Sequence, residues 1–476
     1  MKKYILAAGL LFSMIGCSDD YYDSINVDQT NPSTVPASFL VTHATTSLFH
    51  QMGSTNVNLN VFRMFAQYFT TTTYTQEPNY DLNTRNIPGQ HWNRLYTRVL
   101  FSLQDAKQKV QDDTTLLPAE KNNQLAMIEI MEVYTWQVLV DTFGNIPYSE
   151  ALQGLDNQFP AYEKAPVIYE DLVARAQHAI SLIDTNVDGL SEDIIFGGNM
   201  SLWKKTGGSL LLRLGVQLSD VNQSLASSAI NSAMQAGVIS SNSENFQMNH
   251  LSSTPYTNPL YEDLVLSGRT DFLPANTVVD YMNDLNDPRR AFYFDDLETG
   301  TYSGGIYGAP NSYLTYSHLG TLLYTATTPS CLIDYAEVEF LLAEAAEKGY
   351  NVGGSVESHY NAGIKASMEY WGVDTADADA YLASSDVAFS TAQGNAKQKI
   401  AKQFWLAMYN RGFEGWNVWR RLDAPTLNVA AQSGSPVPTR YTYPESESSI
   451  NSEAYNQAVS DMGGDTQTIK LFWDVN

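Results

Sequence analysis

Aromatic side chains in predicted loops are the residues of this chain whose chemistry points most clearly to a ligand. The sequence holds 29 tyrosines and 8 tryptophans. A flat ring packs on the apolar C–H face of a sugar, and polar groups beside it bind the hydroxyl edge. The predicted oligosaccharide-binding residues are Tyr74, Tyr80, Arg85, Tyr302, Tyr307, Tyr313 and Tyr316. For each tyrosine, the alternative is that its ring packs a loop against the body of the protein.

Motifs for catalysis or metal binding are incomplete throughout the sequence. The 7 histidines form no HExxH pair, and residues 304–308 lack the spacing of a dinucleotide-binding loop. Residues 184–189 begin like a calcium loop, but Ile195 stands where a bidentate glutamate is needed. Glu192 could ligate from another geometry, yet we favour a polar turn that caps the preceding helix. We therefore predict no catalytic residue, no metal site and no cofactor.

Composition narrows the class of protein. The chain has 476 residues, 43% of them hydrophobic, with a formal net charge of −25. That apolar content predicts a large folded core and excludes a disordered chain. The acidity argues against a nucleic-acid partner, because binding to phosphates needs a basic stripe. Two cysteines cannot form a disulfide framework, and we expect Cys331 to be a small buried hydrophobe.

The first residues have the pattern of a bacterial lipoprotein signal. Lys2 and Lys3 precede an apolar stretch at 4–15, which is shorter than the roughly 20 residues that span a bilayer. Gly16 before Cys17 resembles a lipobox, and an acidic cluster follows directly. We predict a signal peptide at 1–16, an acylated Cys17 with a tether at 17–33, and a single domain at 34–476. The alternative is cleavage of a soluble exported protein.

The periodicity of the body predicts helix after helix, and so an all-α fold. Asn199 is the expected N-cap of one helix, and Asp334 with Glu337 has the spacing of a capping box. The clearest predicted helices cover 122–140, 166–183, 199–218, 334–348, a segment starting near 355, and 394–411. The helix at 122–140 is apolar almost all round, which indicates burial. Two helices joined by a short Gly-rich link read as a helical hairpin, the unit of tetratricopeptide-type arrays.

Between these helices lie three long irregular segments, at 71–90, 240–275 and 295–330, and loops of this length are typically functional. Trp92, Trp203 and Trp405 are predicted core residues. Glu337 is explained by capping, and we expect the other glutamates of its helix to form a solvated face: Glu339, Glu344 and Glu347.

Several stretches together resemble the SusD/RagB family of outer-membrane nutrient-binding lipoproteins, in its SusD-like branch. They lie at 141–151, 203–214, 335–345, 360–368 and 438–474, and in this order they cover nearly the whole mature chain. The resemblance implies tetratricopeptide-like helix pairs as a scaffold, with long irregular loops forming the ligand face. Arg440, Tyr441 and Tyr443 also have a plain structural reading, in which they lock the C-terminal segment against the body.

The resemblance also implies a function. It implies a surface-exposed lipoprotein, held in the outer membrane by its N-terminal lipid, that captures oligosaccharides and delivers them to a TonB-dependent SusC-like transporter. Some family members handle peptides, so an oligopeptide receptor of the same architecture is an alternative. A surface glycoside hydrolase with an unrecognised carboxylate pair is another. No family motif carries a ligand residue across, so the site residues above rest on composition and placement.

Overall fold

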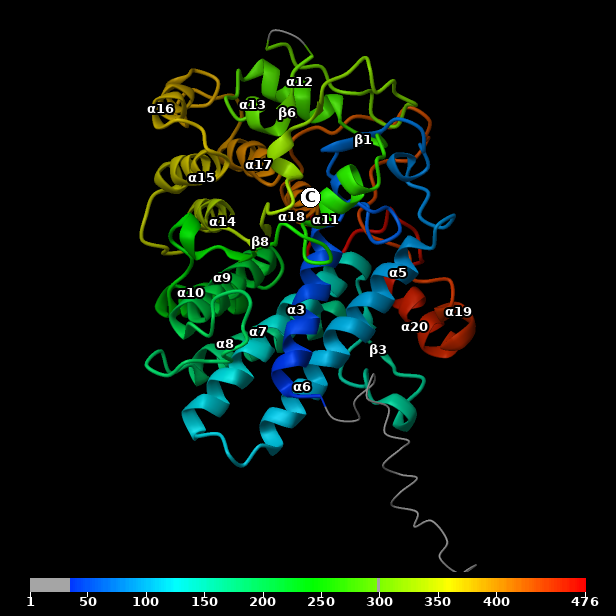
Figure 1. Cartoon of the computed structure of the whole chain (residues 1–476), viewed down its shortest axis with the longest axis vertical. Coiled ribbons are helices and arrows are strands. Elements are labelled where there is room, and N and C mark those ends of the chain that lie inside the picture. Colours follow the sequence, from blue (N-terminus) through cyan, green and yellow to red (C-terminus); the bar gives the residue numbers. More distant parts are fainter. Residues whose placement is uncertain (1–34, 298–299) are drawn as a thin grey trace, which may run out of the picture.

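The computed structural model describes residues 35–297 and 300–476 of the chain. The predicted signal peptide, Cys17 and the tether lie outside these residues. Helices make up most of the described structure, which confirms the all-α prediction (Figure 1). None of the described helices is both long enough and apolar enough to cross a membrane.

The main helices follow the chain in order, separated by loops and by short helical turns. Their bounds are α3 (Ala37–Gly53), α5 (Ile87–Asn93), α6 (Phe101–Asp112), α7 (Pro118–Phe143), α8 (Ala165–Leu182), α9 (Met200–Leu218), α10 (Gln223–Ala236), α12 (Asn276–Asp284), α14 (Tyr335–Glu347), α15 (Val356–Trp371), α16 (Thr375–Ala383), α17 (Ala396–Ala407), α18 (Gly412–Leu422) and α20 (Ser452–Met462). The shorter ones are α4 (Phe62–Phe65), α11 (Pro259–Tyr261), α13 (Arg290–Tyr293) and α19 (Glu447–Ile450). Six short segments have 3-10 or π-helical geometry: η1 (Glu77–Asn79), η2 (Arg94–Leu100), η3 (Gly154–Asp156), η4 (Asn242–Glu244), η5 (Glu262–Leu266) and η6 (Thr321–Leu323).

Four packed helix pairs form the scaffold. They are α3 with α6, α7 with α8, α9 with α10, and α14 with α15. In Figure 1 these pairs run from the bottom of the molecule up its left side. The arrangement is the tetratricopeptide-like scaffold that the sequence resemblance implied.

The strands are short and join segments that are distant in the sequence. Antiparallel pairs form between β1 (Phe69–Thr71) and β5 (Phe272–Pro274), β2 (Ile146–Pro147) and β3 (Tyr162–Glu163), β4 (Phe246–Met248) and β8 (Ser330–Ile333), and β6 (Phe294–Asp295) and β7 (His318–Leu319). These pairs fix long segments that the sequence shows only as irregular, because each ladder ties one loop to another.

Polar caps begin the helices where the sequence predicts them. The side chain of Asn199 accepts hydrogen bonds from the backbone N–H groups of Ser201 and Leu202. Asp334 accepts one from the N–H of Glu337 at the start of α14, and Gly349 ends that helix with φ of +86°. Each cap satisfies backbone groups that the helix itself leaves without a partner.

The glutamates of α14 correct the prediction. Glu337 does not complete a capping box: its carboxylate is buried and binds Arg213 and Arg411. Glu344 is buried as well and pairs with Arg421 at 3.0 Å, so it does not belong to a solvated face. These roles depend on arginines from distant parts of the chain. A capping pattern within one helix contains no information about such partners.

The C-terminal segment closes the core, as predicted. Arg440 is fully buried and binds Asp465 at 2.7 Å, and the hydroxyl of Tyr443 donates to the carbonyl of Asn145 at 2.7 Å. The N–H of Tyr441 donates to the carbonyl of Thr142 at the end of α7. The predicted core residues Trp92, Trp203 and Trp405 are buried too. Cys331 is half-buried in β8, and its thiol points at the carbonyl of Phe246, 3.7 Å away.

Candidate functional site

A hollow of about 400 Å³ lies beside the β1–β5 ladder, on the loop side of the molecule. We call it the Tyr74 groove. It is lined by Asn56, Val57, Asn58, Thr71, Tyr74, Glu77, Arg85, Asp263, Ser267, Arg269, Asp271 and Phe272. This volume is in the range of small-molecule sites, and the lining mixes one exposed ring with charged and amide groups.

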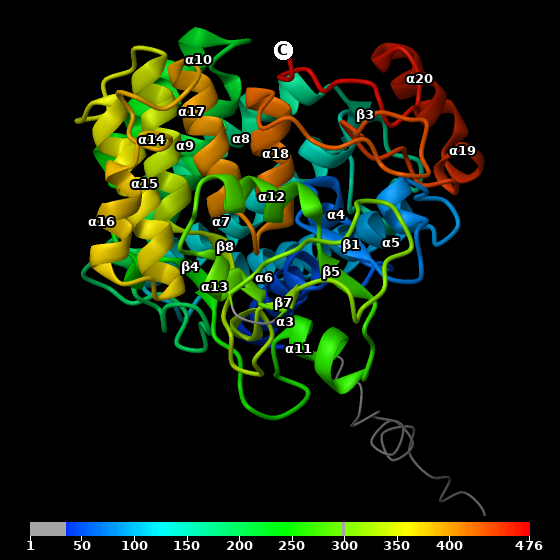
Figure 2. The ribbon, with the colours of Figure 1, turned by 90° about the horizontal axis from the view of Figure 1, so that it is seen from above.

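Two segments that are nearly 200 residues apart build the groove. In β1 and β5, Phe69 pairs with Pro274 and Thr71 with Phe272, which places the chain after β1 beside the chain before β5. The N–H of Thr72 continues the ladder by donating to the carbonyl of Asp271 at 2.9 Å. Figure 2 shows the two strands side by side. The ladder therefore holds Tyr74 next to the loop that carries Arg269.

Tyr74 is the aromatic centre of the groove. Its side chain is 42% exposed. The guanidinium carbons of Arg85 and Arg269 lie 5.3 Å and 5.6 Å from the ring centroid. Contacts of this kind between an arginine and a ring are worth about 0.5–1 kcal/mol at exposed sites, so they hold the three side chains together.

Acidic side chains orient both arginines. The Nε of Arg85 donates to the fully buried carboxylate of Glu77, and the Nε of Arg269 donates to Asp271. Neither arginine makes a second ion pair with a described residue. Each guanidinium therefore keeps its terminal amino groups for other acceptors, and a planar fork of donors suits two neighbouring oxygens.

Asp263 belongs to the wall of the groove. Its carboxylate accepts hydrogen bonds from the hydroxyl of Ser54 at 2.7 Å and from the N–H of Thr55 at 3.1 Å. Burial raises the pKa of Asp263 above its usual range, and these hydrogen bonds oppose the rise. Each acid of the groove thus holds a neighbouring group in place, which is a positioning role.

The charges of the groove nearly cancel. Two arginines face three carboxyl groups, so the formal charges differ by only one unit. A site without strong net charge favours an uncharged ligand. The ring offers an apolar face, while the arginine amino groups and the amides of Asn56 and Asn58 offer hydrogen bonds.

Only Tyr74 and Arg85 of the predicted ligand residues line this groove. Tyr80 and Tyr307 are buried, with exposures of 5% and 1%, and their ring centroids lie 6.3 Å apart. The hydroxyl of Tyr307 donates to the carbonyl of Met64 at 2.8 Å. Burial raises the pKa of both phenols. These two rings pack loops onto the core, and Tyr80 also lines a second hollow, which is described below.

The other three predicted tyrosines lie in the 295–330 segment and do not line the groove. Tyr302 packs near Phe294 and lies 5.7 Å from the guanidinium of Arg290. Tyr313 stacks on His318 with centroids 3.9 Å apart. Tyr316 is half-buried. A ligand role for these three stays a prediction.

Sequence reasoning missed the half of the groove that comes from the chain around Arg269. The sequence marks 240–275 as a long polar loop, but no pattern of aromatic residues there points to its charged side chains as ligand-binding. Arg269 and Asp271 flank a single threonine before β5. That spacing is the only local sign of the ion pair, and the sequence does not show that β5 pairs with β1.

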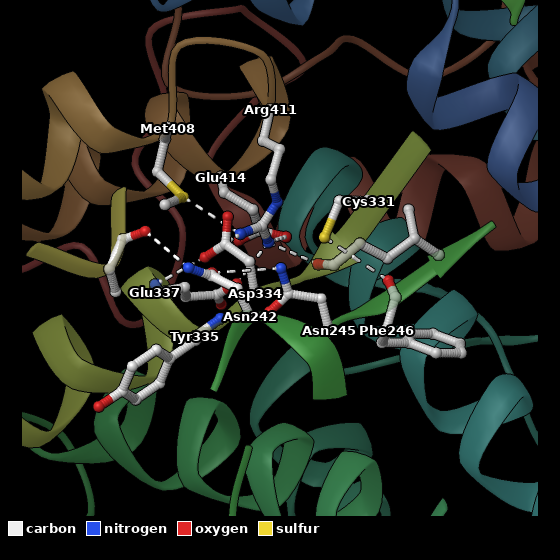
Figure 3. Close-up of polar contacts among 12 residues, drawn as sticks. Asn242, Asn245, Phe246, Cys331, Asp334, Tyr335, Glu337, Met408, Arg411 and Glu414 are labelled. Carbon is white, nitrogen blue, oxygen red and sulfur yellow. Dashed lines mark hydrogen bonds and ion pairs between the residues drawn. The ribbon is translucent and has the colours of Figure 1, made fainter. Parts of the chain in front are cut away.

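A second cluster of charged residues, centred on Arg411, lies deep in the core (Figure 3). Arg411 binds Asp334 at 3.1 Å and also contacts Glu337. Arg213 binds Glu337 at 2.6 Å and Glu414 at 3.1 Å. All five side chains are at most 9% exposed. This buried charge cluster joins α9, α14 and α18.

The pKa values of these acids diverge because two cations face three carboxyl groups. Burial alone would raise the pKa of Glu337, but Arg213 and Arg411 bring it below its usual value. Burial raises the pKa of Asp334, against the attraction of Arg411. For Glu414, burial raises the pKa to about 7 despite Arg213. A neutral Glu414 balances the charge of the cluster.

Carboxyl groups with shifted pKa values are common in catalytic sites. The space beside the cluster decides whether a substrate could reach these groups. The hollows beside it measure about 20 Å³ and 10 Å³. Such volumes hold about one water molecule and exclude a sugar ring. The geometry therefore supports a structural role for these carboxyl groups.

The calcium-like sequence at 184–189 forms a polar turn. The carboxylate of Asp184 accepts hydrogen bonds from the backbone N–H and the side-chain amide of Asn186, at 2.9 Å and 3.0 Å. These bonds lower the pKa of Asp184. Within 35–297 and 300–476, no three His, Cys, Asp or Glu side chains are grouped so that they could hold a metal ion.

Comparisons with known proteins agree with the geometry of the fold. The model of the SusD-like_2 family, described as starch-binding associating with outer membrane, matches residues 29–444. No curated protein matches the chain.

Solved structures match over almost the whole chain. A chitin-binding protein is 27% identical, with a TM-score of 0.80, covering 92% of this chain and all (100%) of that one. A SusD homologue from Bacteroides uniformis is 25% identical, with a TM-score of 0.78, covering 92% and 100%. A chitin-binding SusD homologue from Flavobacterium johnsoniae is 24% identical, with a TM-score of 0.78 and coverage of 92% and 99%, and this likeness speaks for the fold alone.

Proposed function

The chain belongs to the SusD-like family, and from this we propose that it captures oligosaccharides in the Tyr74 groove without chemically changing them. The observation that carries the proposal is the groove itself. An exposed ring, two arginine forks held by acids and two amides converge on one hollow with little net charge. This set of groups fits both the apolar face and the hydroxyl edge of a sugar.

The relatives support a glycan as ligand. The matched family is described as starch-binding, and a chitin-binding protein is similar over 92% of the chain. Both starch and chitin are polymers of uncharged sugars. The near-neutral groove is consistent with such a ligand.

The test is calorimetric titration of the mature protein with soluble oligosaccharides, including those from starch and chitin. We expect dissociation constants between micromolar and millimolar, because few contacts form in an open groove. Tyr74→Ala should weaken binding at least tenfold, which corresponds to about 1.4 kcal/mol. The matched control is Tyr256→Ala, since Tyr256 is 61% exposed and does not line the groove.

The other functions predict different results in the same experiment. Binding of peptides without binding of any sugar would favour an oligopeptide receptor. Appearance of shorter sugars after incubation would favour a hydrolase. Equal loss of affinity in the two tyrosine variants would remove the groove from the proposal.

We also propose that the protein is attached to the outer membrane at the cell surface through an acylated Cys17. Support comes from the lipobox-like sequence and from the family description, which names association with the outer membrane. Cys17→Ala should fold normally and leave the membrane fraction, because the acyl chain supplies the apolar anchor. Cys331→Ala removes the other cysteine and should stay in that fraction. Retention of Cys17→Ala would contradict the anchor.

The proposed partner is a TonB-dependent SusC-like transporter that receives the captured glycan. The proposal rests on the family to which the chain belongs. Affinity purification of the tagged lipoprotein from solubilised outer membranes should recover a barrel protein in constant ratio. Recovery of the lipoprotein alone under mild detergent would argue against a stable complex.

A further inference from the structure

Trp419 differs from every other tryptophan of the chain. All 8 tryptophans lie within the described residues, and seven of them are at most 7% exposed. Trp419 is only half-buried. It lies on α18 and lines a second hollow, of about 500 Å³, which we call the Trp419 trough. The exposed part of its ring therefore borders a hollow whose volume is in the range of small-molecule sites.

The ring of Trp419 packs partly against the core, but it stacks on no other described ring and its N–H has no described acceptor. Two other tryptophans, Trp416 and Trp473, enclose the guanidinium of Arg420, whose carbon lies 3.5 Å and 4.8 Å from their ring centroids. Both donate their indole N–H groups to acceptors within the core. For Trp419, by contrast, no described residue stacks on the ring or accepts a hydrogen bond from its N–H. The exposed part of the ring and the N–H at its edge are therefore available to a ligand in the trough.

The walls of the trough come from two extended segments. One segment runs from Pro425 to Thr439, and the other holds Thr468, Lys470 and Asp474 near the C-terminus. The rim mixes two kinds of side chain: Thr426, Ser435 and Thr468 are exposed hydroxyl residues, and Val429, which is 81% exposed, is apolar. Such a rim offers both donors and acceptors to a ligand lying over the ring.

The charges around the trough are balanced. Arg420 and Lys470 face Asp423 and Asp474, and Lys470 lies 3.3 Å from Asp474. Neither a cation nor an anion gains from a field of this kind. A partly exposed aromatic ring, apolar side chains, rim hydroxyl groups and zero net charge together favour an uncharged ligand that has both apolar faces and hydroxyl groups.

We propose that the Trp419 trough is a second glycan-binding site, which takes an uncharged sugar with one ring face on Trp419. The class of ligand rests on the proposed function, but the site is separate from the Tyr74 groove. The two hollows lie on either side of one short segment: Glu77 of η1 lines the groove, and Tyr80, just after η1, lines the trough. A long glycan that reaches both gains affinity from its raised local concentration.

The test uses the full mature protein labelled with 5-fluorotryptophan and observed by fluorine NMR. Trp419→Phe identifies the resonance of Trp419 by its disappearance. Triacetylchitotriose and maltotriose are then titrated separately, up to tens of millimolar. We expect at least one of them to shift the Trp419 resonance, and the shift should persist in Tyr74→Ala, where the first groove is impaired.

A pair of matched variants separates binding in the trough from indirect effects. Thr468→Arg places a long side chain on the rim and should abolish the shift. Thr114→Arg makes the same change at an exposed position between α6 and α7 that does not line the trough, and should leave the shift intact. Both changes lie on the surface, so folding is not at risk.

The outcomes distinguish this inference from the proposed function. Sugar binding that Tyr74→Ala abolishes, with the Trp419 resonance unmoved, would overturn the second site and leave the first. Failure of both trisaccharides to bind anywhere would count against the glycan class as a whole. A shift of Trp419 with a tripeptide but with neither sugar would overturn the choice of ligand for the trough.

Discussion

Glu414 shows how one buried side chain can make the stability of the whole protein depend on pH. In the folded state burial raises its pKa to about 7, against an ordinary value of 4.5. The folded protein therefore holds this proton to a higher pH than the unfolded chain does. Between pH 4.5 and about 7 the folded state binds more protons, so this group's contribution to stability falls as pH rises through that window.

Glu414→Gln should remove this dependence. Glutamine keeps the shape and a hydrogen-bonding carbonyl near Arg213 but carries no charge at any pH. We expect the variant to gain roughly 1–3 kcal/mol relative to the wild type between pH 5 and pH 8. Urea unfolding followed by circular dichroism across this range measures the difference. Glu357→Gln, on an exposed position of α15, is the control, and parallel curves for Glu414→Gln and the wild type would contradict the assignment.

At the scale of single elements, the caps predicted from the sequence stabilise the starts of the helices. Asn199 satisfies two backbone N–H groups at the start of α9, a helix whose residues are mostly buried. Asn199→Ala should destabilise the protein by about 1 kcal/mol, because these donors lose their acceptor. The unfolding midpoint in urea should fall at an unchanged slope.

Two further substitutions serve as controls for that prediction. Asn199→Asp keeps an oxygen acceptor and adds a charge that the helix N-terminus favours, so it should match the wild type. Asn351→Ala changes an exposed loop residue and should shift stability by less than about 0.5 kcal/mol. A loss in Asn351→Ala equal to that in Asn199→Ala would refute the capping role.

The elements also show what a sequence can and cannot predict here. Helix positions and caps are written in patterns a few residues long, so α8, α9, α14 and α15 appear close to where the sequence places them. The burial of Tyr307 depends on Met64, 243 residues away, and no local pattern contains that contact. The same holds for Glu344 and Arg421.

The candidate site also combines residues that a local sequence pattern predicts with residues that only the folded chain brings together. Tyr74 and Arg85 are close in sequence, in a loop whose composition already suggested sugar binding. Arg269 joins them only because β1 pairs with β5. Exposure of Trp419 is likewise a property of the packed molecule, since in the sequence it looks like its buried neighbour Trp416.

At the scale of the whole molecule, the C-terminal segment joins two helices of the core. Trp473 is 1% exposed and donates its indole N–H to Asp141 of α7 at 2.8 Å. Its ring also lies 4.8 Å from the guanidinium of Arg420 on α18. One side chain near the end of the chain thus bridges a scaffold helix and the helix that carries Trp419.

Trp473→Ala should therefore weaken the whole fold. Removing a buried tryptophan costs about 3–5 kcal/mol, through lost burial and the cavity that remains. Asp141 also loses a hydrogen-bond donor, and burial has already raised its pKa. The midpoint of urea unfolding, read by circular dichroism, should fall accordingly. Val475→Ala, two residues on at a 55% exposed position, should leave the midpoint in place, and equal midpoints for both variants would show that the segment does not close the core.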